Sequence, residues 1–299
     1  MLKFNWKRLG LVAGLSLTLF AAGCGSDDES SDSKEGTSGE GESKEIELVY
    51  VEWDSEVAST HVIGKVLEDQ GFDVTLTPLD NAVMWEAVAN GEADGMVAAW
   101  LPGTHQSQYE QYGDQVVELG VNLEGAKIGL VVPEYMDVTS IEDLDKQADQ
   151  TITGIEPGAG VVAASEKAVE DYENLSDWTV QTSSSGAMAT ELGSAIENEE
   201  EIVVTGWTPH WKFAKYDLKY LEDPKGSFGE AETIETMVRE GLEEDMPNAY
   251  QILDQFSWTA EDMEAVMLEI SDGAKPTEAA ANWIEENQDK VDEWLKGVE

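Results

Sequence analysis

The sequence predicts an α/β fold with two lobes, each a mainly parallel sheet flanked by helices, and a ligand cleft between the lobes. Short strand-like and longer helix-like hydrophobic segments alternate over residues 46–207, which is typical of parallel βαβ units. The same order of segments occurs twice, with Trp100 and Trp207 at equivalent positions of the two copies. A chain of 299 residues is long enough for both units.

The first repeat predicts a βαβαβ unit. Short runs rich in β-branched residues mark its strands, and apolar residues that recur every three or four positions mark its helices. The strands are expected at residues 46–51, 74–79 and 96–100, and the helices at 57–70 and 81–90.

The second repeat predicts the same unit, with strands at residues 151–155, 179–182 and 202–207 and helices at 160–172 and 187–198. Its register matches the first repeat at more than one point. Pro102 and Pro209 each follow the aligned Trp by two positions, and the separation of Trp53 from Gly160 equals that of Trp100 from Trp207. Two units of like order predict two similar lobes.

The remaining segments connect or cover these units. An apolar stretch at 127–132 joins them, and residues 217–222 return the chain. Three amphipathic helices are expected at 247–256, 260–270 and 277–295, packed on the first lobe. We therefore predict a first lobe of residues 46–130 and 218–299 and a second lobe of residues 131–217.

The segment 1–23 has the composition of a signal peptide. Lys3, Lys7 and Arg8 precede an apolar stretch over 9–22, and small residues stand directly before Cys24. This pattern resembles the lipobox of bacterial lipoproteins, in which the Cys is acylated. Residues 24–45 are acidic and rich in Gly and Ser, so they are expected to form a tether.

Composition excludes several classes of function. The chain has 63 Asp and Glu against 17 Lys and Arg, a formal net charge of −46, so nucleic-acid binding is not expected. One Cys allows no intramolecular disulfide, and three dispersed His with that single Cys do not have the spacing of a metal site. We predict no metal and no cofactor.

Three tryptophans are expected at the carboxyl ends of strands, where α/β sheets place their ligands. They are Trp53, Trp100 and Trp207, and the last two begin similar Trp-Xaa-Pro turns. Such matching positions favour a shared aromatic site. Other tryptophans are assigned differently: Trp85, Trp283 and Trp294 to the core, with Trp178 and Trp258 left open between core and ligand.

Several segments resemble the glycine betaine-binding proteins of bacterial ABC importers of the OpuA type. They are WLPGTH at 100–105, GIEPGAG at 154–160, and TGWTPHW at 205–211 continuing through FAKYDL at 213–218. The resemblance extends over about residues 46–296. It implies a type II binding protein, not an enzyme, anchored by lipid on the extracytoplasmic face of the cell membrane. Its partners would be an ABC permease and ATPase subunits, and its ligand a compatible solute.

The chemistry of a quaternary ammonium supports an aromatic site independently. This head group has no N–H donor, so it is held by the negative faces of aromatic rings. By resemblance, Trp53, Trp100 and Trp207 form the cage, with two rings from the first half of the chain and one from the second. Closure of the lobes would then complete the cage.

The other end of betaine is a carboxylate, which needs hydrogen-bond donors. A Gly-rich turn opens the helix expected at residue 160, and it is either an anion site or a plain tight turn. By resemblance, the amides of Gly160 and Val161 hold the carboxylate and His105 also donates to it. His210 either contacts the ligand or orients the cage from behind, and His61 is expected to be structural.

The sequence also allows three alternative functions. A carbohydrate-active enzyme would also combine Trp with carboxylates, but Glu52 and Asp54 flank Trp53 too closely to form an opposed catalytic pair. A metal-dependent hydrolase is not supported, because the His and Cys residues of this sequence do not have the spacing of metal ligands. The third is a binding protein for another solute, such as choline, carnitine or proline betaine, and a carboxylate site disfavours choline.

Overall fold

The computed structural model describes residues 44–299. The predicted signal peptide, Cys24 and the tether up to residue 43 lie outside this range, so the lipid anchor stays a prediction. Within the described range, no helix combines the length and the apolar character that crossing a membrane requires.

The first half of the sheet has a parallel core extended by antiparallel strands. Strand β1 (Glu45–Tyr50) pairs in parallel with β2 (Asp73–Pro78) and with β3 (Gly95–Leu101). Strand β9 (Glu232–Arg239) then pairs antiparallel with β3 and with β4 (Val116–Pro133). The parallel strands match the sequence prediction, whereas β9 and the first part of β4 were not predicted.

Helices cover this half of the sheet. The connections between its strands contain α1 (Asp54–Asp69), α2 (Asn81–Ala89) and α3 (Gln106–Tyr112). The C-terminal helices are α7 (Leu242–Asp245), α8 (Pro247–Gln255), α9 (Ala260–Ser271), α10 (Pro276–Glu286) and α11 (Gln288–Trp294). Helices α9 and α10 contact α1, so this part of the chain packs back on the first half as predicted.

The helix predicted over 277–295 is two helices. They meet at Asn287, whose side-chain amide donates to the carbonyl of Trp283 at 2.8 Å. A side chain that bonds a backbone carbonyl competes with the helical pattern. This local competition accompanies the end of α10.

The second half of the sheet repeats the parallel core. Strand β5 (Thr151–Thr153) pairs in parallel with β6 (Thr179–Gln181) and β7 (Val203–Thr208), and β8 (Leu218–Tyr220) pairs antiparallel with β4. Its helices are α4 (Gly160–Asp171), α5 (Ser185–Glu197) and α6 (Lys212–Lys215). Short 3₁₀ helices lie at Gly113–Gln115, Ile141–Asp143, Gln147–Gln150 and Glu173–Leu175.

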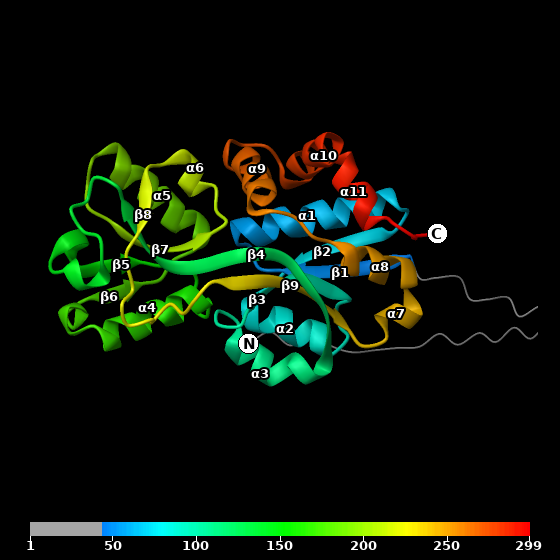
Figure 1. Cartoon of the computed structure of the whole chain (residues 1–299), viewed down its shortest axis with the longest axis horizontal. Helices are drawn as coiled ribbons and strands as arrows, with labels where there is room; N and C mark the ends of the chain where they lie inside the picture. The colour runs from blue at the N-terminus through cyan, green and yellow to red at the C-terminus, as the bar shows by residue number, and fades with distance from the viewer. Residues whose placement is uncertain (1–43) are drawn as a thin grey trace, which may run out of the picture. The chain divides into compact units, whose positions relative to one another are not determined.

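Strand β4 belongs to both halves. Its residues 116–126 pair with β9, and its residues 127–133 pair with β7 and β8. In Figure 1 this long green strand runs from the half that contains β1–β3 to the half that contains β5–β7. The strand order is therefore β2-β1-β3-β9-β4-β7-β5-β6. The lobe boundaries at residues 130 and 217 stay predictions. Strand β8 follows the second boundary, and it pairs with the 127–133 part of β4, which also pairs with β7.

The other five tryptophans named in the sequence prediction are buried and do not line the pocket described below. Trp85, Trp283 and Trp294 are buried as predicted, and the rings of Trp283 and Trp294 stack with centroids 5.7 Å apart. Trp178 and Trp258, which the sequence left open, are also buried and do not line the pocket between the halves. Both therefore belong to the core.

Candidate ligand-binding site

A pocket of about 290 Å³, its mouth included, lies where the two halves meet. The first half contributes Trp53, Ser55, Glu56, Trp100 and Thr104. The second half and the end of β4 contribute Ile128, Ile155, Ala159, Gly160, Val161 and Trp207. A mostly apolar wall with a few polar groups is the usual composition of a small-molecule site.

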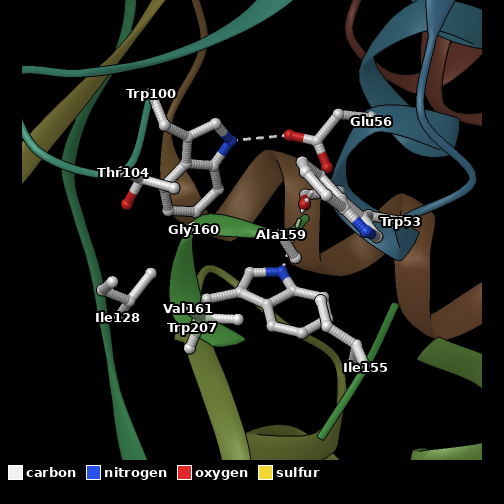
Figure 2. A pocket seen from close by; sticks show the side chains of 11 residues that line it. Trp53, Glu56, Trp100, Thr104, Ile128, Ile155, Ala159, Gly160, Val161 and Trp207 are labelled. Atoms are coloured by element: carbon white, nitrogen blue, oxygen red, sulfur yellow. Dashed lines mark hydrogen bonds between the residues drawn. The ribbon is translucent and has the colours of Figure 1, made fainter. Parts of the chain in front are cut away.

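The three tryptophans predicted from strand ends meet in this pocket. Trp53 precedes α1 directly, Trp100 lies near the end of β3, and Trp207 lies near the end of β7. Each is less than a tenth exposed, and their rings surround one space in Figure 2. Because two rings come from the first half and one from the second, the cage is complete only while the halves are in contact.

The N–H edges of two of these rings are connected to one acid. Trp100 Nε1–H donates to Glu56 Oε1 at 2.7 Å, and the Ser55 hydroxyl donates to Glu56 Oε2 at 2.6 Å. Trp207 Nε1–H in turn donates to Ser55 Oγ at 3.1 Å. This network pairs the polar edges of both rings, so a ligand in the pocket meets their faces. One side of the Trp207 ring is contacted by Lys212 Nζ, 4.2 Å from the ring centroid.

The first turn of α1 also connects the two halves. Asp54 accepts from Trp211 Nε1–H at 2.7 Å and from the Ser185 hydroxyl at 2.8 Å, both in the second half. Trp53 Nε1–H donates to Glu156 at 3.2 Å. Although burial favours the neutral acid, His210, Trp211 and Ser185 hold the pKa of Asp54 well below its usual range. A charged Asp54 therefore stabilises the contact between the halves.

The N-terminus of α4 forms the opposite side of the pocket. Gly160 and Val161 are its first two residues, and the first N–H groups of a helix have no partner within it. A Cβ on Gly160 would lie 2.4 Å from the backbone oxygen of Thr104, so only Gly allows this approach. The loop of Thr104 is itself held by Glu232, which accepts from the amides of Gly103 and Thr104 at 2.6 Å. The result is an anion-compatible helix end beside the aromatic cage.

His105 does not line the pocket but lies directly behind one of its walls. It is fully buried, and its ring stacks on Trp53 with centroids 5.9 Å apart. Its Nδ1 accepts from the backbone N–H of Trp100 at 3.1 Å, and burial lowers its pKa to about 3. The neutral ring therefore carries its hydrogen on Nε2, which has no hydrogen-bond partner in residues 44–299.

His210 occupies the corresponding place behind the third ring. Its ring packs edge-on against Trp207 with centroids 4.5 Å apart, and its Nε2 lies 3.5 Å from Asp54 Oδ2. Burial, and then the charge of Lys212, lower its pKa to about 4. The position favours support of the cage from behind over ligand contact. His61, in α1, has Nδ1 2.8 Å from the Val57 carbonyl.

Ser55 and Glu56 were not predicted from the sequence. The helix was expected to begin at residue 57, whereas α1 begins at Asp54, so these residues lie in its first turn and line the pocket. An Asp or Glu in the first turn of a helix directly after a strand-end Trp was the available signal. The part of the chain that the structure describes contains no group of three or more His, Cys, Asp or Glu that could hold a metal ion.

Comparison with known families decides the relationship. Residues 44–286 match the family described as the substrate binding domain of ABC-type glycine betaine transport systems. The chain belongs to this family. The resemblance found in the sequence is thus confirmed, and the family is one of transport substrate-binding proteins.

Individual relatives agree with this assignment. The chain is 55% identical over 159 residues to the glycine betaine/carnitine transport binding protein GbuC of Listeria monocytogenes, and the match spans about half of each protein, 53%. Lactococcal OpuAC, solved in its closed-liganded conformation with glycine betaine, is 60% identical with a TM-score of 0.83, covering 85% of this chain and 100% of that one. A choline binding protein in complex with choline is 27% identical with a TM-score of 0.79, covering 85% and 93%. These neighbours have the type II binding-protein fold, which confirms the predicted fold class.

Proposed function

We propose that this protein captures glycine betaine, or a closely related betaine, outside the cytoplasm and delivers it to the permease of an ABC importer for osmoprotectant uptake. The ATPase subunits of the importer would complete the system. The observation that carries this proposal is one pocket in which three indole rings and a helix N-terminus face the same space.

The two ends of the pocket suit the two ends of a betaine. The rings of Trp53, Trp100 and Trp207 offer negative faces to a trimethylammonium group, which no hydrogen-bond acceptor can hold directly. The amides of Gly160 and Val161 offer donors to a carboxylate at the positive end of the helix dipole. By the family resemblance we also assign His105 Nε2–H to this carboxylate, although in this structure its ring lies behind Trp53 and does not line the pocket.

A calorimetric titration with glycine betaine, choline and maltose tests this function. Glycine betaine is expected to release heat with a single-site isotherm, choline to bind more weakly, and maltose not to bind. Binding of maltose without binding of glycine betaine would refute the proposal, because a sugar needs hydrogen-bonding side chains around most of its surface and the wall of this pocket is mostly apolar.

The second candidate is a choline-binding protein. It is favoured by the likeness to the choline-bound structure and by the cage, which would suit any trimethylammonium head group. Choline has a hydroxyl in place of the carboxylate. The backbone N–H groups of Gly160 and Val161 would then have no carboxylate to which they could donate. Tighter binding of choline than of glycine betaine in the same titration would select this candidate.

We assign the extracytoplasmic protein to the membrane surface through acylation of Cys24. The basic and apolar segments that precede Cys24 support this location.

A further inference from the structure

Glu56 is a buried acid in the pocket wall without a cationic partner. It is 1% exposed, and it forms no ion pair with any Lys, Arg or His of residues 44–299. Among these residues, its two oxygens accept from the side chains of Trp100 and Ser55. Removing a carboxylate from water is strongly unfavourable unless hydrogen bonds or an opposite charge compensate it.

The hydrogen bonds of Glu56 end on the rings of the cage. Trp100 donates to it directly, and Trp207 donates to it through Ser55. A carboxylate that accepts from the N–H edge of an indole polarises the ring, since hydrogen-bonded groups polarise one another in a low dielectric. The ring face then becomes more negative and attracts a cation more strongly.

The electrostatic setting of Glu56 points in the same direction. Burial raises its pKa to about 7, and the charge of Asp54 on the same turn raises it as well, while the hydrogen bonds from Ser55 and Trp100 lower it. An acid in this state is readily converted to the charged form by a cation placed nearby. If packing were the only role of this position, an amide or apolar side chain would fill it without that cost.

The geometry points to Glu56 as the counter-charge for the cationic head group and as the residue that positions Trp100 and Trp207 around it. This inference rests on the proposed function and deepens it: the site selects a positive charge, and does not merely accept a trimethyl group of the right size. A ligand of the same shape with an uncharged head group should therefore bind more weakly than glycine betaine.

The decisive comparison uses glycine betaine and 3,3-dimethylbutanoate, in which carbon replaces the quaternary nitrogen while shape and carboxylate are kept. Both ligands are titrated by calorimetry into the wild-type protein, Glu56→Gln and Glu68→Gln. Gln keeps the acceptor for Trp100 and removes the charge, and exposed Glu68 on the same helix provides a matched control. E56Q should weaken glycine betaine about tenfold or more, leave 3,3-dimethylbutanoate unchanged or tighter, and E68Q should change neither.

Two results would overturn the inference. One is E56Q binding glycine betaine as tightly as the wild type; the other is E56Q weakening both ligands equally, which is the signature of a purely structural role. If E56Q does not fold, Glu56→Asp keeps the charge and must still prefer glycine betaine to its carbon isostere. Failure of the wild type to bind any quaternary ammonium would instead refute the proposed function.

Discussion

The contact between Gly160 and Thr104 predicts a substitution that opposes closure without disturbing the fold. In Gly160→Ala, the new Cβ would lie 2.4 Å from the backbone oxygen of Thr104 and 2.6 Å from its Cγ2. Ordinary contacts of a Cβ begin at 3.4 Å, so the two surfaces must separate by about 1 Å. A backbone oxygen cannot rotate away, and overpacking of this kind costs about 1–3 kcal/mol.

The cost should appear in binding rather than in folding. Ala is a good helix former at the start of α4, so only the joined state of the two halves is penalised. Glycine betaine should therefore bind about five- to 150-fold more weakly. Calorimetry measures this loss, and thermal unfolding without ligand checks that the variant remains as stable as the wild type.

Gly186→Ala is the matched control. Gly186 lies in the first turn of α5 in the same half of the protein, and a Cβ there meets nothing within 4 Å. It should leave affinity unchanged. Two results would contradict a role of this contact in closure: Gly160→Ala binding glycine betaine as tightly as this control, or Gly160→Ala losing ligand-free stability in proportion to its loss of affinity.

Four further outcomes are expected. Trp207→Ala should weaken glycine betaine by about 1–3 kcal/mol, and Trp207→Phe by less, because Phe keeps a ring face; calorimetry that finds no loss would contradict the cage. His105→Ala should cost glycine betaine about 1.5–3 kcal/mol and leave choline nearly unchanged, and an equal loss for both ligands would remove His105 from the carboxylate end. Burial raises the pKa of Glu56 from 4.5 to about 7. This group should therefore stabilise the ligand-free protein below pH 4.5, and that stability should be lost as pH rises through about 7. Thermal unfolding should show a smaller decrease of the melting temperature over this pH range for E56Q than for the wild type. Cys24→Ala should release the protein from membranes or block its processing, and unchanged detergent partitioning would argue against acylation.

The fold class and the three tryptophans that line the pocket were predictable from the sequence. The repeat that aligns Trp100 with Trp207 and the alternation of segments predicted the βαβαβ units, and both units are present in the structure. Trp53, Trp100 and Trp207 were identifiable because strand ends are local features, and parallel strands bring their carboxyl ends to one edge. Gly160, at the start of α4, was also identifiable, because a Gly-rich turn before a helix is a local feature of the sequence. These features depend on short stretches of sequence.

The hydrogen-bond network around the three tryptophans depends on contacts between distant parts of the chain. Glu56 is one acid among 63. No local sequence pattern indicates that its carboxylate accepts from Trp100, or that Ser55 links it to Trp207. The same holds for His105: its Nδ1 accepts from the backbone N–H of Trp100, and its Nε2 has no partner among residues 44–299. Hydrogen bonds across the cleft join residues far apart in the chain, and their partners depend on how the two halves of the sheet are joined through β4. Local periodicity contains no information about such distant pairs, so packing alone determined which polar groups support the site.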